Sequence, residues 1–367
     1  MKVIVVGGGI MGLCAAWALH RRSHRVTVYE QGAVPNPLAS SSDQQRLIRY
    51  TYGAMAGYAA MVRQAYDAWD LLWTDLDQRL YAETGTLCIV RGDGAWVRES
   101  AEGLAAMHVP AEKLTVEGVR AMVPFVATED VAWALHTPTG GILFAERIVA
   151  ALGRHLRHNG QAVADHCPVA AVDPAKAEIV LADGRRDEAD ALVVAAGPWS
   201  GRLVPALRGR VTPSRQRVVY LEPPARHADA WRRAPAILDQ IEATRGGFFA
   251  VPPVGGTGLK MGDHGFTLQG DPDHDREPTD ADVTSLTALC RGRIEHFDQY
   301  RPICAKTCFY SVTADERFIV EPVDRAWVLA GFSGHGFKFG AILGLVLADT
   351  LEGQRTPDSL MNWAAGR

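Results

Sequence analysis

The glycines near the start of the chain have the spacing of a phosphate-binding turn. Gly7, Gly9 and Gly12 fit the pattern Gly-x-Gly-x-x-Gly, directly after the apolar run 2–6 and before apolar residues at helical spacing. In such a turn the first glycine permits a tight bend, the second lets the backbone approach a pyrophosphate, and the third lets the helix pack closely on the strand. The helix N-terminus adds free N–H groups for phosphate oxygens. Strand, glycines and helix in this order favour dinucleotide binding over an ordinary turn between a strand and a helix.

An acidic residue completes this pattern. A second strand, expected over 25–29, ends at Glu30. This residue lies roughly 20 positions beyond the glycines, where a carboxylate accepts hydrogen bonds from ribose hydroxyls. The stretch predicts dinucleotide binding and leaves the identity of the dinucleotide open.

Other residues could support different chemistry. Arg46 and Arg49 are three residues apart and would share one face of a helix, either as a binding pair or as part of a solvated surface. The aspartates of 271–275 alternate as in a calcium loop, but Arg276 stands where that loop needs glycine. We therefore expect a solvated acidic loop there and no metal site.

The composition is typical of a globular protein without a nucleic-acid or membrane-binding surface. The 367 residues carry a net charge of −4, with 47% hydrophobic and 22% charged residues, and the basic residues are scattered. No apolar run approaches the length of a membrane span and no secretory signal is visible, so we expect a cytoplasmic protein. The six cysteines lack Cys-x-x-Cys spacing, which indicates neither a disulfide framework nor a zinc site.

The arrangement of strand signals predicts two interleaved domains. Apolar, parallel-type strands are expected at 2–6, at 190–197 and near the C-terminus, while antiparallel signals occupy the segments between them. The fold class is therefore α/β, or α+β overall. A Rossmann-like dinucleotide-binding domain would interleave with an antiparallel-sheet domain.

Two C-terminal segments show a resemblance to a known family. They are Cys308-Phe309-Tyr310-Ser311-Val312-Thr313-Ala314-Asp315-Glu316-Arg317-Phe318-Ile319 and Gly331-Phe332-Ser333-Gly334-His335-Gly336-Phe337-Lys338-Phe339. With the opening glycines, they make the chain resemble the D-amino-acid-oxidase-like flavoenzymes over essentially its whole length. Within these it is similar to the group that contains monomeric sarcosine oxidase and oxidases of N-methyltryptophan, pipecolate and fructosyl amino acids.

The resemblance implies an FAD-binding domain of residues 1–80, 144–212 and 316–367, and a substrate-binding domain of 81–143 and 213–315. It also implies that Cys308 is bonded through sulfur to the 8α carbon of FAD. The small residues at the end of the strand 190–197 leave room for a ligand. The implied cofactor-binding residues are Gly7, Gly9, Ile10, Met11, Gly12, Glu30, Arg46, Leu47, Val169, Ala196, Gly197, Cys308, Gly331, Ser333, Gly334, His335, Gly336 and Lys338.

The same resemblance assigns the catalytic residues. Lys260 matches a lysine held near flavin N5 that activates oxygen, and His264 matches an active-site histidine. Arg49 and Lys338 would hold the substrate carboxylate, and Tyr310 would line the substrate side. Arg46 matches an arginine packed over the opposite face of the flavin. A hydrolase interpretation of Ser333 fails, because a nucleophile elbow needs glycine where His335 stands.

Two departures from the family pattern concern the substrate. Sarcosine oxidases carry histidines before the arginine pair, where this chain has Ser41, Ser42 and Asp43. Phe249 stands near a position where relatives present tyrosine, which indicates a more apolar pocket. Sarcosine itself is therefore a doubtful substrate.

The function implied by this resemblance is oxidation of the C–N bond of a secondary or cyclic amino acid to an imine, with oxygen reduced to hydrogen peroxide. Four alternatives stay open: a flavin-dependent dehydrogenase with another electron acceptor, an oxidase of primary or fructosyl amino acids, an NAD-linked dehydrogenase, and a non-catalytic flavin-binding module. The expected partners are a small-molecule amine and oxygen, with no nucleic acid and no membrane. Relatives of this group are often monomers.

Overall fold

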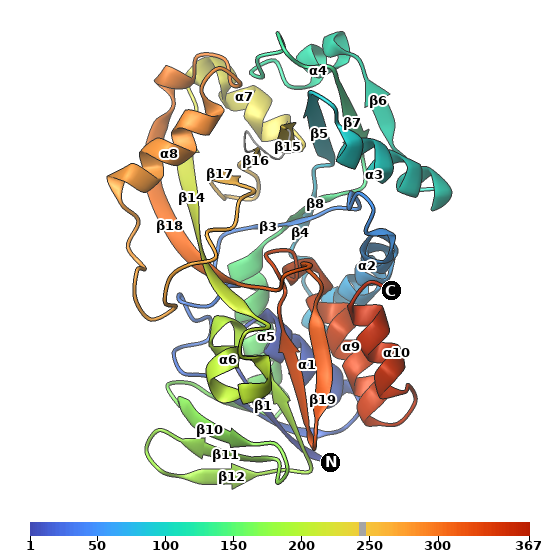
Figure 1. Ribbon diagram of the computed structural model, residues 1–367, viewed down its shortest axis with the longest axis vertical. Helices are drawn as coiled ribbons and strands as arrows, with labels where there is room; N and C mark the ends of the chain where they lie inside the picture. Colours follow the sequence, from blue (N-terminus) through green and yellow to red (C-terminus); the bar gives the residue numbers. More distant parts are fainter. Residues whose placement is uncertain (242–246) are drawn as a thin grey trace.

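The computed structural model describes residues 1–241 and 247–367 of the chain. The molecule is elongated, with a six-stranded sheet and its helices in the lower half of Figure 1 and an eight-stranded sheet in the upper half. Both halves draw their strands from interleaved stretches of sequence, so the predicted mixed fold is confirmed. The exact domain boundaries given above stay a prediction. Among the described residues, no helix combines the length and the apolar character of a membrane span.

The six-stranded sheet has the order β19-β20-β13-β1-β2-β9, in which all neighbours are parallel except β19 and β20. Its strands and covering helices are β1 (Lys2–Val6), β2 (Arg25–Tyr29), β9 (Ala162–Ala164), β13 (Ala191–Val194), β19 (Ile319–Val323), β20 (Ala326–Ala330), α1 (Ile10–Arg21), α2 (Ala56–Leu76), α5 (Ala145–His158), α9 (Gly340–Leu351) and α10 (Pro357–Ala364). This is the Rossmann-like domain that the glycine pattern predicts.

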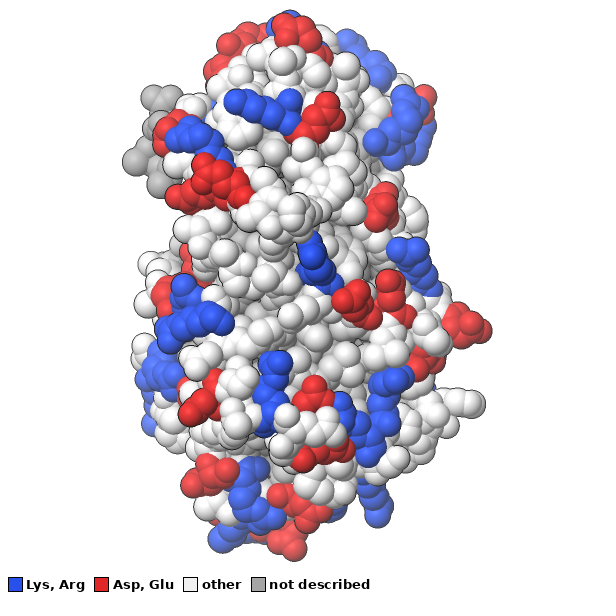
Figure 2. All heavy atoms as spheres, turned by 90° about the vertical axis from the view of Figure 1, so that its right-hand side faces the viewer, with Lys and Arg blue, Asp and Glu red and all other residues white. Residues whose placement is uncertain are grey.

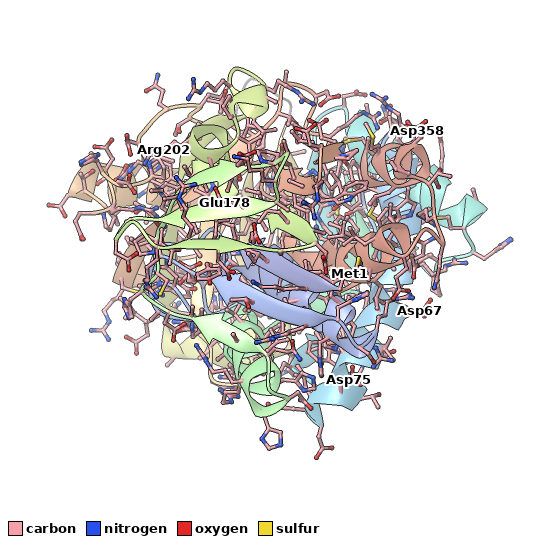
Figure 3. All side chains as sticks on the ribbon, turned by 90° about the horizontal axis from the view of Figure 1, so that it is seen from below. Met1, Asp67, Asp75, Glu178, Arg202 and Asp358 are labelled. Carbon is pink, nitrogen blue, oxygen red and sulfur yellow. The ribbon has the colours of Figure 1, made fainter. Side chains whose placement is uncertain are left out.

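Side-chain alternation decides what covers each face of this sheet. Val3 and Val5 pack against α1 and α9, whereas Ile4 and Val6 pack against the small sheet β10 (Val169–Asp173), β11 (Glu178–Leu181) and β12 (Arg186–Glu188). Seen from below, this small sheet with Glu178 lies across the lower end of the molecule (Figure 3). Because both faces are covered, β1 can be an uninterrupted apolar run.

The eight-stranded sheet has the order β18-β14-β17-β16-β15-β5-β7-β6 and is antiparallel except for the pair β15 and β5. Its strands and helices are β5 (Thr86–Arg91), β6 (Glu112–Leu114), β7 (Trp133–Thr137), β14 (Thr212–Glu222), β15 (Ala236–Ile241), β16 (Phe248–Val251), β17 (Leu259–Asp263), β18 (Arg301–Val312), α3 (Ala95–Ala106), α4 (Val116–Met122), α7 (Ala225–Arg233) and α8 (Asp280–Cys290). Helices α4, α7 and α8 cover one face through Val119, Trp231 and Leu286, and the other face turns toward the lower half.

Short elements connect the two halves. A three-stranded sheet, in the order β3-β8-β4, lies between them and consists of β3 (Arg46–Ile48), β8 (Gly141–Leu143) and β4 (Tyr81–Glu83). Arg46 therefore begins a strand, and the helix that would place Arg46 and Arg49 on one face is wrong. Arg49 lies just beyond the end of this strand.

Helices α1 and α9 approach each other closely at Gly344. A Cβ added at Gly344 would lie 2.4 Å from the backbone oxygen of Cys14, which cannot move without shifting α1. By contrast, a Cβ added at Gly103, within α3, would meet nothing within 4 Å. The same glycine-to-alanine change should therefore have opposite effects at the two positions.

We predict that Gly344→Ala lowers the free energy of unfolding by about 1–3 kcal/mol through overpacking. Gly103→Ala should raise it by roughly 0.5–1 kcal/mol, because alanine loses less conformational freedom in a helix. Urea unfolding followed by tryptophan fluorescence measures both. Equal effects of the two substitutions would contradict the close packing of α1 on α9.

Candidate active site

The opening glycines shape one wall of a cavity at the carboxyl ends of the parallel strands. Gly7 has φ +108°, and a Cβ there would lie 2.4 Å from the backbone oxygen of Ala195. A Cβ at Gly12 would lie 1.9 Å from the backbone oxygen of Gly7, so the helix packs directly on the turn. Gly9 is the N-cap of α1. At Gly7 and Gly12 any side chain would therefore collide with backbone atoms.

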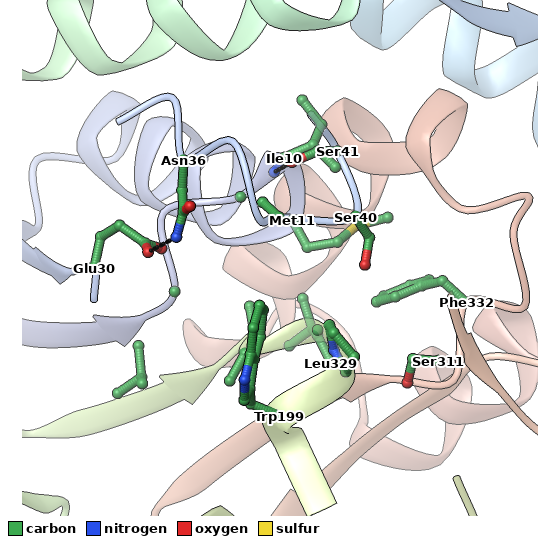
Figure 4. Close-up of a pocket in the computed structure, with 18 of the residues that line it drawn as sticks. Ile10, Met11, Glu30, Asn36, Ser40, Ser41, Trp199, Ser311, Leu329 and Phe332 are labelled. Carbon is green, nitrogen blue, oxygen red and sulfur yellow. Dashed lines mark hydrogen bonds between the residues drawn. The ribbon is translucent and has the colours of Figure 1, made fainter. Parts of the chain in front are cut away.

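Glu30 lies at one end of this cavity. Its carboxylate accepts hydrogen bonds from the backbone N–H groups of Gly8 at 2.6 Å and Gly32 at 3.0 Å, and from the amide of Asn36 at 2.7 Å. Figure 4 shows Glu30 and Asn36 at one side of the cavity and Phe332 and Ser311 at the other, with Ile10 and Met11 between them. The contacts from the turn hold the carboxylate in a fixed position on the cavity wall.

This first cavity has a volume of about 350 Å³ and contains most of the expected cofactor-binding residues. The residues of the sequence prediction that line it are Gly7, Gly9, Ile10, Met11, Glu30, Arg46, Val169, Ala196, Gly197, Tyr310, Gly334 and Gly336. Gly12 and Gly331 line neither this cavity nor the next and act through packing: a Cβ at Gly331, where φ is +66°, would lie 2.5 Å from the Thr313 side chain.

A second cavity, of about 320 Å³, adjoins the first. Both are lined by Arg46, Tyr310, Gly334 and Phe337. The other predicted residues that line the second cavity are Leu47, Arg49, Lys260, His264, Cys308, Ser333, His335 and Lys338. The catalytic residues of the prediction, Arg49, Lys260, His264, Tyr310 and Lys338, therefore meet in one place, although they come from four separate stretches of the chain.

Strand alternation explains how Lys260 enters the second cavity. On β17, Leu259 and Met261 belong to the core beneath α7 and α8, and Lys260 points to the opposite face. The Lys260 ammonium donates to Asp43 Oδ2 at 2.9 Å and to the backbone oxygen of Gln45 at 2.6 Å. Burial lowers the pKa of Lys260, and the carboxylate of Asp43 opposes that shift.

Lys338 is held by a chain of hydrogen bonds on the other side of the second cavity. Its ammonium donates to the hydroxyl of Tyr52 at 2.8 Å and to the backbone oxygen of His335 at 2.8 Å. Burial is the main cause that lowers the pKa of His335 to about 3, and the nearby Lys338 lowers it further. The ring is therefore neutral at pH 7. His335 Nε2 then donates to the backbone oxygen of Glu316 at 2.9 Å, and Nδ1 accepts from Tyr52 at 3.3 Å.

Arg49 provides a second cation near Lys338. Its guanidinium lies 4.9 Å from the ring centre of Tyr52 and 5.3 Å from that of Trp96, and donates to the Thr51 hydroxyl at 3.3 Å. Among the described residues, no carboxylate forms an ion pair with Arg49. Its planar group is therefore available to bind a carboxylate in the cavity.

His264 and Tyr310 complete the wall. His264 is exposed at the edge of the cavity, and partial desolvation there, with Arg49 nearby, lowers the pKa of its ring. Tyr310 packs on Gly334, whose absent Cβ would lie 2.4 Å from the tyrosine ring. Burial raises the pKa of Tyr310, which stays protonated.

Cys308 lines the second cavity from β18, and its neighbour along the strand, Cys304, is exposed. Burial raises the pKa of the Cys308 thiol, and the cations Arg46, Lys260 and Arg276 oppose that rise. A thiolate in this position would therefore have three positive charges around it.

Sequence reasoning overlooked two functional side chains. From the sequence, Asp43 is only a departure from the family pattern, yet its carboxylate binds Lys260 and Arg46 in the cavity wall. Its position three residues before Arg46 was the available signal. Trp96, on helix α3, contacts Arg49, and no sequence pattern predicts this contact.

The two cavities together fit an extended dinucleotide. One end has the glycine turn and an acid for a ribose, as in other dinucleotide-binding folds. The other end has backbone-accessible glycines and the basic side chains of Lys260, Lys338 and Arg46, of which the two lysines are buried, for a ring that carries negative charge when reduced.

Comparison with known proteins agrees with this geometry. The family model described as "FAD dependent oxidoreductase" matches residues 2–350, so the chain belongs to that family of flavoenzymes. It is similar to monomeric sarcosine oxidase of Bacillus sp. (strain B-0618), with 28% identity over 94% of this chain and 90% of the relative. N-methyl-L-tryptophan oxidase of Yersinia pestis (strain Pestoides F) shows 26% identity over 100% of this chain and 98% of its own length.

Solved structures share the fold. L-proline dehydrogenase from P. horikoshii superposes with a TM-score of 0.84 at 18% identity, covering 100% of this chain and 96% of that one. Glycine oxidase from Geobacillus kaustophilus superposes with a TM-score of 0.81 at 22% identity, covering 97% and 96%. The predicted family, fold class and FAD dependence are thus confirmed.

The neutral state of His335 predicts a pH effect on stability. Above about pH 6.5 the ring is neutral in both folded and unfolded chains. As the pH falls below that value, the unfolded chain binds a proton that the folded chain, with a pKa of about 3, does not. The free energy of unfolding should therefore fall by about 1–2 kcal/mol between pH 6.5 and 5 through this group, allowing for its partial exposure.

In His335→Gln this part of the pH dependence should disappear. Urea unfolding of the wild type and the variant at pH 6.5 and pH 5 measures the difference in slope. An identical slope in the two proteins would show that His335 is protonated in the folded state.

Proposed function

We propose that this flavoenzyme oxidises the C–N bond of a secondary, N-alkyl or cyclic amino acid to an imine, with oxygen reduced to hydrogen peroxide. The observation that supports it most strongly is Arg49, a guanidinium in the second cavity without an ion-paired carboxylate among the described residues, close to the buried ammonium of Lys338. Burial and, after it, Arg49 lower the pKa of Lys338 well below its ordinary value, so a substrate carboxylate would serve both basic side chains as a counter-ion.

The remaining wall of the cavity favours an apolar side chain on the substrate. Met55, Trp96, Leu238, Phe249 and Val251 line it. A substrate held by its carboxylate would place its α-carbon and amine beside this wall and near the position expected for the flavin ring. Bound FAD supplies the two-electron acceptor, and the protein fixes the distance and orientation of the C–H bond that is oxidised.

The sequence relatives support the reaction class. The relatives named above are oxidases of sarcosine and N-methyl-L-tryptophan, both N-methylated amino acids. The apolar wall makes an N-methyl amino acid with a large side chain the better candidate for this chain than sarcosine. On the basis of the same relatives, we also propose the catalytic and cofactor-binding roles given to the site residues in the sequence analysis. We propose the division into an FAD-binding and a substrate-binding domain on the same basis.

The direct test mixes the purified protein with a panel of N-methyl amino acids in the absence of oxygen. Loss of the yellow flavin absorbance identifies a substrate, and hydrogen peroxide formation after oxygen is admitted identifies an oxidase. Bleaching without peroxide would indicate a dehydrogenase that uses another acceptor. If no amine in the panel bleaches the flavin, the proposed function is wrong.

The role of Arg49 gives a quantitative prediction. Arg49→Ala should raise KM for an N-methyl amino acid roughly 30- to 1,000-fold, about 2–4 kcal/mol of lost binding to a buried charge. Arg49→Lys should raise KM less, because it keeps the charge and loses the bidentate geometry. Steady-state kinetics measure both effects, and the exposed Arg98→Ala serves as a matched control. The assignment would be contradicted if Arg49→Ala impaired a carboxylate-free N-methylamine to the same degree.

We further propose that Cys308 attaches FAD through its sulfur. After acid precipitation, the yellow colour should stay with the pellet in the wild type and move to the supernatant in Cys308→Ser. Cys304→Ser, on the same strand, should behave as the wild type. Colour released from the wild type would show that the flavin is not covalently bound.

A further inference from the structure

Asp43 is a buried carboxylate with all its acceptor positions engaged. Oδ2 accepts from Lys260 at 2.9 Å and from Arg46, and Oδ1 accepts from the hydroxyl of Tyr220 and from the backbone N–H of Gln44 at 2.9 Å. The side chains of Asp43 and Lys260 are each only 4% exposed. The carboxylate therefore links the segment before β3 to strands β14 and β17 of the eight-stranded sheet.

This arrangement fixes the ammonium of Lys260. A lysine ammonium has three N–H donors, and here two of them bind Asp43 and the backbone oxygen of Gln45. The third remains available to a group in the second cavity, which Lys260 lines. Asp43 thus decides where the remaining donor can point.

Asp43 is also the counter-charge of Lys260. The ionisable groups that act on Lys260 are Asp43, Arg46 and Cys308, and Tyr220 is its partner across the β14–β17 pair. Burial raises the pKa of both Cys308 and Tyr220, which are therefore neutral at pH 7. Burial would also raise the pKa of Asp43, but Lys260 and Arg46 hold it well below its ordinary value. Asp43 is thus the one anion among these groups.

We infer that Asp43 is the positioning residue that keeps Lys260 charged and directed into the second cavity for the reaction with oxygen. This inference rests on the proposed oxidase function. Conversion of dioxygen to hydrogen peroxide consumes two electrons, which the amine substrate supplies through the cofactor, and two protons. Negative charge develops on oxygen as the first electron arrives, and a fixed ammonium stabilises it.

Removal of the charge on Asp43 should therefore impair one half of the reaction. In Asp43→Asn, Lys260 and Arg46 would lie together in a buried site without a counter-ion, and Lys260 would lose its proton. We expect the rate constant for reoxidation by oxygen to fall at least tenfold at pH 7 and to recover toward lower pH. The rate of anaerobic reduction by substrate should change less than threefold. Stopped-flow absorbance measures the two rates separately.

Tyr220→Phe is the matched control, because it removes one hydrogen bond to the same carboxylate and keeps the charge. It should leave both rates and their pH profiles within threefold of the wild type. Equal impairment by the two variants would show a merely structural role for Asp43, and an unchanged reoxidation rate in Asp43→Asn would overturn the inference. Failure of anaerobic reduction in the wild type would instead refute the proposed function.

A second readout does not depend on turnover. The flavin absorbance of the oxidised wild-type protein is titrated between pH 6 and 10, with Lys260→Met as the reference that lacks the ammonium. A transition that depends on Lys260 should move down by at least one pH unit in Asp43→Asn relative to the wild type. If the Asp43→Asn protein does not fold, a Lys260-dependent transition below pH 7 in the wild type would still overturn the inference.

Discussion

Leu259, Lys260 and Met261 are consecutive residues of β17, and their side chains leave the strand in opposite directions. The two apolar side chains close the core beneath α7 and α8, and the lysine enters the second cavity. Phe248 and Ala250 on β16 likewise join the core, whereas Phe249 and Val251 line the cavity. One sheet therefore supplies both the stability of the upper half and the reactive wall of the site, since a strand has two faces.

The cavity gathers more positive than negative charge. Arg46, Arg49, Lys260 and Lys338 line it, and Asp43 pairs with two of them. Asp263 and Glu316 also line it. Asp263 bonds to Arg217, and burial raises the pKa of Glu316 while Arg49 opposes that rise. Buried cations without partners are costly, and this chain offsets the cost with aromatic rings beside Arg49 and with neutral acceptors around Lys338. The remaining positive charge suits a carboxylate substrate and a flavin that becomes negatively charged on reduction. This agrees with the proposed division in which Arg49 and Lys338 bind the substrate and Lys260 acts on oxygen.

The sequence predicted the elements whose signal is local. The glycine turn, the buried strands and the two C-terminal segments are each contained within a dozen residues, so their order was sufficient for the fold and for the family. The spacing of Arg46 and Arg49 was ambiguous, because three residues can span a helical turn or part of a strand, and pairing of β3 with β8 decided in favour of the strand. Asp43 and Trp96 were missed because their importance lies in contacts to Lys260 and Arg49, which only the tertiary structure creates.

A crystal structure of the FAD-loaded protein with a small carboxylate inhibitor tests this account most directly. We expect the flavin ring where the two cavities meet, beside Arg46 and Tyr310, which line both of them. The inhibitor carboxylate should lie within hydrogen-bond distance of Arg49 and Lys338, and Lys260 should remain bound to Asp43. A carboxylate bound to Lys260, or a flavin ring outside the second cavity, would contradict the assignment of substrate and oxygen to different lysines.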